Sequence, residues 1–404
     1  MPFEGRATVA HATAAMTTPE STSRFRERAL PTWRRAVVKV GSALLAGDDG
    51  ISARHALKIG HALSELAERG REIVLVSSGA VAAGRGLLRT HKAAAADALP
   101  ARQALAALGQ VQVVALWQRF FDRPVAQVLL THDDLRNRRR YLNARATLRE
   151  LLALGAIPVV NENDTVSVDE LKVGDNDNLA AHVAMLVGAD LLVLVSDVDG
   201  LFDADPRRNP HAKPQYRVAR ITEGVRQMAG GAGSRVGTGG MATKLEAAAR
   251  AADAGIPTAI VNGTRGVALA AFARDRLIGT RIDAARDRDA ARKSWLRNSP
   301  VAPGRVAIDS GAARALSERG ASLLPRGVVG VEGEFSRGDV VEIVCPARNG
   351  VALVARGIAQ YGAGEIRRVL GARSDEIAAK LGYEYGSEIV HRDDLALVTA
   401  PRTR

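Results

Sequence analysis

The stretch Ala36-Val37-Val38-Lys39-Val40-Gly41-Ser42 decides the fold. It is a short apolar run, rich in β-branched residues, that ends at a glycine, as expected for a strand buried on both faces of a parallel sheet. Five further runs of this kind follow it: Ile73–Val76, Val125–Leu130, Ile157–Val160, Leu191–Val195 and Ile256–Val261. Helical patterns separate the runs. This alternation predicts an α/β fold with a doubly wound, mainly parallel sheet and with ligands at the carboxyl ends of its strands.

The helices between these runs have recognisable ends. Ser52 is placed to cap a helix whose leucines and isoleucine keep helical spacing until Gly70. A second helix, from Thr243 to Ala254, ends at Gly255. We therefore expect one α/β domain over residues 35–285.

The remainder of the chain has a different pattern. Residues 1–34 mix charged residues with Ser, Thr and Pro and lack an apolar signal-peptide core, so we expect a disordered leader. Charges dominate from Arg281 to Arg297, which predicts a linker or a solvated helix and places the linker at residues 286–302. Short strands and Gly-rich turns then predict a small β-barrel-like domain over residues 303–394, followed by a tail over 395–404.

Composition excludes several classes of protein. The 404 residues are 47% hydrophobic and 25% charged, which is typical of a soluble globular protein of about two domains. No apolar run is long enough to span a membrane. A single cysteine, Cys345, rules out an intrachain disulfide and fits a reducing compartment such as the cytoplasm. The net charge of +12 raises the question of nucleic-acid binding, but aromatic residues for base stacking make up only 4%.

Two strand ends carry groups suited to anions. Lys39-Val40-Gly41-Ser42 combines a positive charge with a glycine whose backbone lets an anion approach closely. Ser77-Ser78-Gly79-Ala80 offers hydroxyls and turn amides, although an ordinary helix cap explains this segment equally well. Only 8 of the 56 basic residues are lysines, so Lys39 and Lys244 indicate that a compact ammonium group is required at their positions.

The densest polar cluster follows the strand at 157–160. Asn161-Glu162-Asn163-Asp164 ends that strand, and Asp175-Asn176-Asp177-Asn178 opens a helix eleven residues later. This density exceeds what helix capping needs, and it offers acceptors for a substrate amino group and carboxylates to orient lysines or Mg²⁺. Calcium binding is an alternative, but the spacing does not match an EF-hand loop.

Two further segments are suited to a nucleotide. Ser196-Asp197-Val198-Asp199-Gly200 follows the strand at 191–195, and Thr238-Gly239-Gly240-Met241-Ala242-Thr243-Lys244 leads into a helix. A glycine pair lets the backbone wrap phosphates while Lys244 reaches the transferring group. Neither a Walker A sequence nor a Gly-x-Gly-x-x-Gly fingerprint is present, so P-loop and Rossmann nucleotide sites are not predicted.

Together these motifs resemble the amino-acid kinase superfamily, and their order and spacing are most similar to those of the glutamate 5-kinase family. The resemblance covers about residues 35–285, and residues 303–392 look like the PUA domain that many bacterial members carry. It implies ATP-dependent phosphorylation of the glutamate γ-carboxylate, the first step of proline biosynthesis, with Mg²⁺ and without a dedicated protein metal site.

The resemblance also assigns roles to residues. It implies that Lys39 and Lys244 stabilise the transferring phosphoryl group and that Asp177 holds both lysines. Glutamate is expected at Ser78, Asp164 and Asn176, with Asp175 and Asn161 nearby. ATP is expected at Lys39, Ser196, Asp197, Thr238, Gly239, Gly240, Met241, Ala242, Thr243 and Lys244. Ser196 stands where family members often have threonine, which keeps the hydroxyl.

Three other functions remain open from the sequence. A sister kinase for aspartate, acetylglutamate or UMP would share Lys39 and Asp197, although the polar clusters at 161–164 and 175–178 argue against it. An RNA-binding protein is possible because PUA-like domains occur in such proteins. A sensor that has lost catalysis is disfavoured by the presence of both lysines. By resemblance, we also expect a homo-oligomer, inhibition by proline and transfer of the product to glutamyl phosphate reductase.

Overall fold

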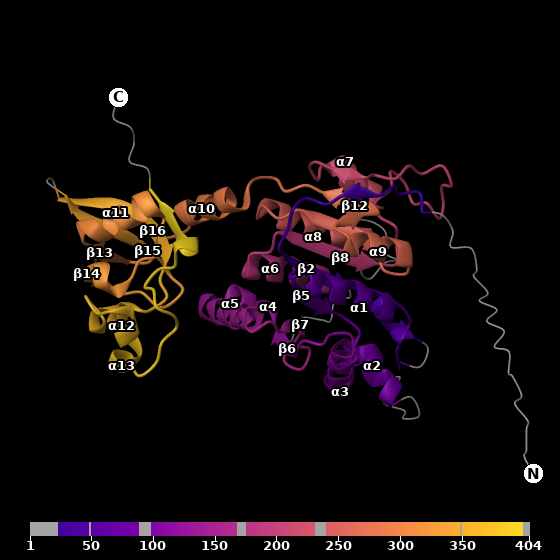
Figure 1. Cartoon of the computed structure of the whole chain (residues 1–404), viewed down its shortest axis with the longest axis horizontal. Helices are drawn as coiled ribbons and strands as arrows, with labels where there is room; N and C mark the ends of the chain where they lie inside the picture. Colours follow the sequence, from indigo (N-terminus) through magenta and orange to yellow (C-terminus); the bar gives the residue numbers. More distant parts are fainter. Residues whose placement is uncertain are drawn as a thin grey trace, which may run out of the picture.

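The computed structural model describes residues 23–47, 50–88, 98–167, 175–230, 240–347 and 350–398. Figure 1 shows two bodies joined by the helix α10 (Arg288–Asn298). The larger body contains an eight-stranded sheet, and the smaller one contains a five-stranded sheet. The predicted division into an α/β domain and a small β-rich domain is confirmed.

The large sheet is mainly parallel and contains all six predicted strands. Its order is β6-β7-β5-β2-β8-β10-β12-β9. The strands are β2 (Arg35–Val40), β5 (Glu72–Ser77), β6 (Val125–Leu130), β7 (Ile157–Glu162), β8 (Leu191–Ser196), β9 (Arg217–Val218), β10 (Thr258–Asn262) and β12 (Gly279–Ile282). Only the pair β10 and β12 is antiparallel. The two strands that the sequence analysis missed, β12 and the edge strand β9, are short.

Helices cover both faces of this sheet because successive side chains of a strand point to opposite faces. On β2, Ala36, Val38 and Val40 pack into one core and Val37 into the other. The first core includes α1 (Ala53–Glu68), α2 (Ala80–Leu87), α3 (Leu99–Gln118) and α9 (Gly266–Ala273). The second includes α5 (Arg138–Ala153), α6 (Asp175–Val187) and α8 (Met241–Asp253). Lys39 shares its face of β2 with Val37 and therefore faces α6 and α8.

Smaller elements complete the α/β domain. They are β3 (Ala46–Gly47), β4 (Gly50–Ile51), α4 (His132–Arg136) and α7 (Glu223–Met228). As predicted, Ser52 caps α1 by accepting a hydrogen bond from the Arg54 amide, and Gly255 after α8 has a positive φ of 81°. Among the described residues no helix is long and apolar enough to cross a membrane.

The expected leader is shorter than predicted, because residues 23–34 pack onto the domain. We call this segment the N-terminal arm. Phe25, Leu30 and Trp33 are buried in the core that contains α1 and α9. Strand β1 (Arg28–Ala29) pairs with β11 (Arg276–Leu277). The boundary expected at residue 34 is therefore too late, because three large apolar side chains hold the arm in place; residues 1–22 lie outside the described part of the chain.

The C-terminal domain is an open sheet with helices packed against it. The strand order is β14-β13-β15-β16-β17, with β13 (Gly304–Ile308), β14 (Val328–Gly333), β15 (Val340–Ala347), β16 (Gly350–Ile358) and β17 (Leu395–Leu397). The helices are α11 (Ser310–Arg319), α12 (Ala363–Arg368) and α13 (Ile377–Leu381). Because Leu395 and Ala396 are buried and pair with β16, residues 395–397 belong to this domain and not to the expected tail.

Between the domains the chain forms the helix α10, which is one of the two alternatives that the charge pattern predicted. Asp287 caps α10, and Leu296 of α10 joins an apolar cluster with Leu142 of α5 and Val340, Ile358 and Ala396 of the C-terminal domain. Arg145 of α5 forms a two-bonded ion pair with Asp394, and both side chains are buried. Core contacts therefore cross the boundary through α5.

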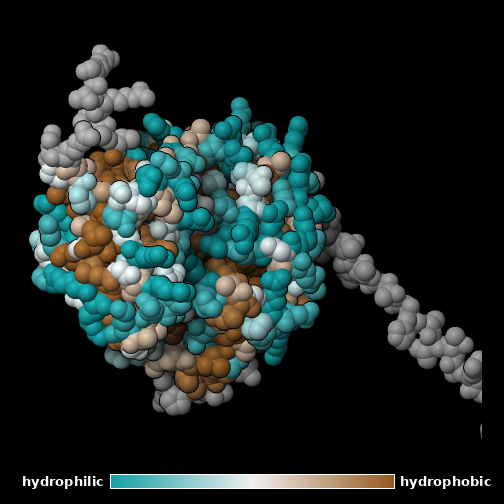
Figure 2. Space-filling model, turned by 60° about the vertical axis from the view of Figure 1, so that its left-hand side comes forward, coloured by the Kyte–Doolittle hydropathy of each residue, from teal (hydrophilic) through white to brown (hydrophobic). Residues whose placement is uncertain are grey.

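The face of the molecule that Figure 2 shows is mainly hydrophilic, with apolar patches among the polar side chains.

Removing the carboxylate of Asp394 tests this contact. Asp394→Ala leaves the Arg145 guanidinium buried without its partner, so we expect the free energy of unfolding to fall by about 3 kcal/mol. Asp393 on the same turn is the matched control, because it is more exposed and its pairs with Arg149 and Arg292 are long. Asp393→Ala should lose less than about 1 kcal/mol in urea unfolding. Equal losses for the two variants would contradict the role of the buried pair.

Candidate active site

The polar strand ends of the sequence analysis meet at one edge of the large sheet. Parallel pairing places Val40 opposite both Ser77 and Val195, and it places Ser196 opposite Asn262. The strands thus end at the same level. The Gly41 amide donates to the Val195 carbonyl at 3.2 Å, and the Ser78 amide donates to the Val40 carbonyl at 3.3 Å. This alignment brings loops that are far apart in the sequence to one place.

Lys39, Asp177 and Lys244 form the centre of the site. Lys39 Nζ lies 2.6 Å from Asp177 Oδ1, and Lys244 Nζ lies 3.4 Å from Asp177 Oδ2. Asp177 is fully buried, and the two lysines are 5% and 4% exposed. The Thr243 hydroxyl lies 2.9 Å from Asp177 Oδ2. Strand β2 supplies one lysine, α8 supplies the other, and the carboxylate lies on the first turn of α6 between them.

The charges of this centre are unequal. Burial alone would raise the pKa of Asp177, but the ammonium groups of Lys39 and Lys244 outweigh it and hold this pKa below its ordinary value. Burial lowers the pKa of Lys39, and the positive charge of Lys244 adds to this effect against the pull of Asp177. One carboxylate cannot neutralise two ammonium groups. The buried centre therefore favours an additional anion, such as a phosphate.

A chain of amide and hydroxyl groups lies on one side of this centre. Asn176 Nδ2 donates to Ser78 Oγ at 2.7 Å and to Asn161 Oδ1 at 3.2 Å. Asn161 Nδ2 donates in turn to Gln110 Oε1 at 2.8 Å. Three predicted glutamate-site residues thus contact one another through α6, the β5 end and the β7 end. Gly79, with a φ of 101°, turns the chain between Ser78 and α2.

Asp164 lies on the turn after β7, next to Glu162 and near Arg102 of α3. Burial raises the pKa of the Asp164 carboxyl to about 6, the charge of Glu162 adds to this, and Arg102 opposes it. Ser167 Oγ donates to Glu162 Oε1 at 3.0 Å, and Gln103 Nε2 donates to the Ser167 carbonyl at 3.0 Å. With a pKa of about 6, the Asp164 carboxyl is mainly ionised at neutral pH, and its charge favours a cation beside it.

The loop after β8 lies on the other side of the lysines. Ser196 Oγ donates to Asp197 Oδ1 at 3.1 Å. Asp199 Oδ1 accepts hydrogen bonds of 2.6 Å from both Asn262 Nδ2 and Arg265 Nε. The exposed Asp197 is close enough to Lys39 to act on its charge. We call residues 196–202 the β8 loop.

The predicted nucleotide segment at 238–244 is only partly described. Gly240 is the N-cap of α8, and Met241, Ala242 and Thr243 form its first turn, where free amide groups suit a phosphate. The Thr243 hydroxyl faces Asp177 and the Gly240 carbonyl. Thr238 and Gly239 lie outside the described residues. Asp175 begins α6, but its side chain is also outside the description.

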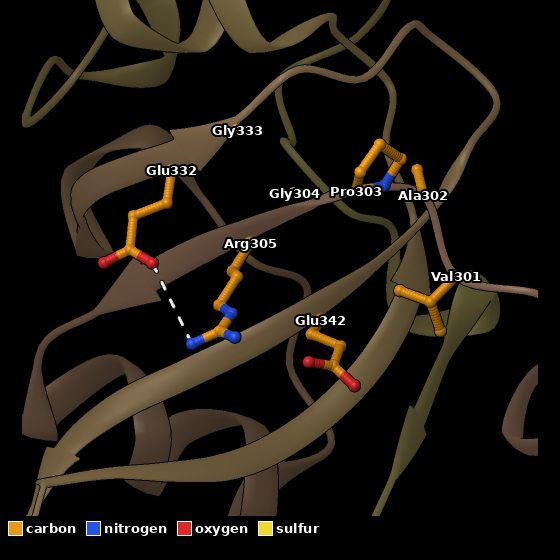
Figure 3. Close-up of a pocket in the computed structure, with 8 residues that line it drawn as sticks. All are labelled: Val301, Ala302, Pro303, Gly304, Arg305, Glu332, Gly333 and Glu342. Atoms are coloured by element: carbon orange, nitrogen blue, oxygen red, sulfur yellow. Dashed lines mark ion pairs between the residues drawn. The ribbon is translucent and has the colours of Figure 1, made fainter.

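An open groove on the C-terminal domain is the main alternative site, with a volume of about 430 Å³. Figure 3 shows Arg305, Glu332 and Glu342 along it. Arg305 pairs with Glu332 at 3.9 Å, and Glu342 pairs with Arg356 at 3.3 Å, so its charges largely compensate one another. Its lining has no lysine and no unbalanced charge, so it lacks what phosphoryl transfer requires.

Comparison with known proteins identifies the family of this chain. Residues 34–262 match the model of the amino acid kinase family, and residues 304–381 match the PUA domain. A glutamate 5-kinase of Xanthomonas campestris pv. campestris (strain 8004) is 61% identical over 363 residues, which are 90% of this chain and 100% of the relative. A glutamate 5-kinase of Xylella fastidiosa (strain M12) is 58% identical over 378 residues, which are 93% and 98% of the two chains. This chain belongs to the glutamate 5-kinase family.

A solved structure is similar to the chain at lower identity. A UMP kinase from Bacillus anthracis has 17% sequence identity and a TM-score of 0.43, and the match covers 63% of this chain and 98% of that structure.

Two side chains that reach the site of this family member were missed by the sequence analysis. Gln110 and Gln103 of α3 contact Asn161 and Ser167, on the side of the site where glutamate was predicted. Gln110 is buried, and its Nε2 has no hydrogen-bond partner among the residues that the structure describes. The sequence signal that could have indicated them is their spacing of seven residues, which places both glutamines on one face of a largely apolar helix. A polar side chain on a buried face needs a hydrogen-bond partner.

The family implies Mg²⁺, and the described side chains can be tested as its ligands. In the described parts of the chain, no group of three or more His, Cys, Asp or Glu side chains is placed to hold a metal ion. Both oxygens of Asp177 face ammonium groups. Mg²⁺ is commonly bound mainly by water and substrate phosphates, so it is better described as part of the nucleotide substrate.

Neutralising Asp177 tests the centre of the site. In Asp177→Asn the two ammonium groups lose their shared counter-charge and their positions, so kcat should fall by about a hundredfold or more, with a smaller change in the glutamate KM. Asn178 is the matched control, because it is the next residue of α6 and contacts Arg250 on the outer side. Asn178→Ala should keep kcat within about twofold. Retention of near-normal kcat in Asp177→Asn would contradict the assigned role.

The pKa of Asp164 predicts a pH dependence. The carboxylate form attracts a substrate ammonium group, and this form is lost as the pH falls through about 6. The value of kcat/KM for glutamate should therefore fall about tenfold per pH unit below that point, since glutamate itself does not titrate near pH 6. Asp164→Asn should lower kcat/KM and remove this acid limb, whereas kcat/KM for ATP should show a weaker dependence. A profile that is flat from pH 7 to pH 5 would refute the assignment.

Proposed function

We propose that this member of the glutamate 5-kinase family transfers the γ-phosphoryl group of ATP to the γ-carboxylate of L-glutamate. The product is L-glutamyl 5-phosphate, and the reaction is the first step of proline biosynthesis. The observation that carries this proposal is the buried pair of lysines on Asp177, with polar groups for an amino acid on one side and the β8 loop on the other. The 61% identity to a curated glutamate 5-kinase supports the choice of substrate.

The chemistry needs alignment and charge more than covalent help. A γ-carboxylate oxygen forms a bond to the γ-phosphorus while the bond from this phosphorus to the bridging oxygen breaks, and ADP leaves with that electron pair. The glutamate carboxylate is already ionised at neutral pH, so no general base is required. Lys39 and Lys244 neutralise the charge on the transferring group and bring two anions together. Asp177 lies between the two ammonium groups and fixes their positions.

Glutamate binds through Ser78, Asn161, Asn176 and Asp164 in this proposal. Asp164 holds the substrate ammonium group, and the amide and hydroxyl groups of the other three orient its carboxylates. The hydrogen-bonded chain from Ser78 to Gln110 supports this role, because a linked set of side chains holds its members in fixed orientations. Asp175 is proposed to lie near this group.

ATP binds through Lys39, Ser196, Asp197 and the segment from Thr238 to Lys244. The amides at the start of α8 face a negative phosphate favourably because a helix N-terminus carries partial positive charge. Mg²⁺ enters with the nucleotide, coordinated by its phosphates.

Regulation and assembly are part of the proposal. Proline inhibits by competing at the glutamate side, and the acyl phosphate passes to glutamyl phosphate reductase because it hydrolyses readily. A homo-oligomer is supported by the apolar outer face of α3, where Leu108 and Val111 are 45% and 65% exposed. The single cysteine supports a cytoplasmic location. RNA binding by the PUA domain has no comparable support.

The test is turnover of ATP with a panel of acceptors: glutamate, aspartate, acetylglutamate and UMP. Hydroxylamine traps an acyl phosphate as a hydroxamate, so glutamate should give ADP and hydroxamate in equal amounts. Proline should reduce both. Turnover with UMP or acetylglutamate but not glutamate would reject the substrate, and no turnover with any acceptor would reject the catalytic proposal.

Two variants assign the two sides of the site in the same assay. Asp164→Ala should raise the glutamate KM about tenfold or more with little change in the ATP KM, because the ammonium group loses its carboxylate. Lys244→Ala should instead lower kcat by orders of magnitude. Asp253→Ala, an exposed carboxylate at the end of α8, is the control for a change of surface charge. An ATP-specific defect in Asp164→Ala would move this residue to the nucleotide side.

A further inference from the structure

The N-terminal arm lies against the β8 loop. Figure 1 shows the arm in indigo, running across the α/β domain toward the part that contains α7 and β12. Its β1 strand pairs with β11, and the Leu30 amide donates to the Asp275 carbonyl at 3.1 Å. These contacts fix the arm on the domain between Arg28 and Trp33. The part before Arg28 extends to the loop.

Phe25 makes the main contact. Its ring centre lies 5.3 Å from that of Phe202 and 5.3 Å from that of Tyr216, edge-on in both cases. Phe25 is 4% exposed. Edge-to-face aromatic pairs of this kind add to the stabilisation from burial. Phe25 therefore packs between Phe202, the last residue of the β8 loop, and Tyr216, which directly precedes β9.

Gly200 allows this close approach. It has a φ of 149°, a backbone conformation that side chains disfavour. A Cβ atom at this position would lie only 2.7 Å from Phe25 Cζ and 2.7 Å from Thr280 Oγ1. The Phe25 ring thus covers the backbone of the loop directly. On the other side, the Leu201 amide donates to Thr280 Oγ1 at 2.8 Å.

The arm also makes polar contacts with the β8 loop and with residues 212–216. Ser23 Oγ lies 3.5 Å from Asp199 Oδ2, the carboxylate that also binds Asn262 and Arg265. Arg24 Nη1 donates to the Ala212 carbonyl at 3.1 Å, and Tyr216 Oη donates to the Arg24 carbonyl at 2.9 Å. The Gln215 amide donates to the Leu201 carbonyl at 2.8 Å and closes the loop on itself.

We propose that Phe25 is a positioning residue for the nucleotide: the N-terminal arm braces the β8 loop through the Phe25 ring so that Ser196 and Asp197 are held for ATP. The proposal rests on the assignment of this loop to ATP. Thr280 accepts a hydrogen bond from the Leu201 amide, and the Phe25 ring of the arm lies against the Gly200 backbone. Without the ring, the backbone at Gly200 gains freedom, and part of the binding free energy of ATP is spent on ordering the loop.

The experiment uses the full chain with Phe25→Ala and steady-state kinetics. We expect the ATP KM to rise at least about fivefold, with kcat at saturating ATP and the glutamate KM within about twofold, since ordering is needed on the nucleotide side only. Phe25→Leu keeps an apolar side chain and should lie between the wild type and Phe25→Ala. If Phe25→Ala does not fold, Phe25→Leu must still raise the ATP KM by at least about twofold while the glutamate KM stays unchanged.

Leu30→Ala is the matched control within the arm. Leu30 is buried as well, but it directly follows β1 and its amide donates to the Asp275 carbonyl next to β11, five residues from Phe25. It should lower the melting temperature and leave the ATP KM unchanged. Hydrogen exchange of the Leu201 and Gln215 amides should accelerate in Phe25→Ala and not in Leu30→Ala. Equal effects of both variants on the ATP KM, or an unchanged ATP KM in the Phe25 variants, would overturn the proposal.

Asp197→Ala separates this inference from the assignment on which it rests. If Asp197→Ala raises the ATP KM and the Phe25 variants do not, the brace is wrong and the nucleotide site stands. If Asp197→Ala leaves the ATP KM unchanged, the loop does not bind ATP and both ideas fall.

Discussion

The ion pairs of Asp177 with Lys39 and Lys244 are the interaction on which the site depends. One fully buried carboxylate holds two ammonium groups that would otherwise repel each other, and the centre keeps a surplus of positive charge. A buried charge is costly unless it is paired, so the unliganded centre is only partly compensated. An anionic phosphate completes the compensation. The same arrangement that weakens the empty site therefore strengthens the binding of a transferring phosphoryl group.

The sheet explains how three residues far apart in the sequence reach one point. Lys39 belongs to the central strand β2, and its side chain emerges on the face covered by α6 and α8, which carry Asp177 and Lys244. A shift of one residue in the register of β2 would turn Lys39 to the opposite face. The apolar residues on both sides of Lys39 fix that register, because Val38 and Val40 fill one core and Val37 fills the other. The packing of these three valines therefore determines that Lys39 faces Asp177.

The sequence was sufficient for those parts of the protein that repeat a local rule. Six buried strands and the cap at Ser52 were predicted because β-branched runs and capping residues are local signals. The contact of Asp177 with Lys39 and Lys244 was expected from the resemblance to the family. The N-terminal arm and Gln110 were not predicted, because their burial depends on partners far away in the sequence: Phe202 and Tyr216 for Phe25, and Asn161 for Gln110. Leu395 and Ala396 were missed for the same reason, since a three-residue edge strand has no period to detect.

The position of α5 shows why the two domains are not independent, although the groups that phosphoryl transfer needs lie in the first. Helix α5 presents Leu142 and Arg145 to the C-terminal domain and Leu148 and Leu152 to the core beneath the sheet. It leads directly into β7, near whose end Asn161 contacts Asn176 on the side of the site proposed for glutamate. A substitution of Asp394 therefore removes a contact of α5, and three residues separate the end of this helix from β7. Through α5, the C-terminal domain therefore packs against the scaffold that carries Asn161, the residue that contacts Asn176.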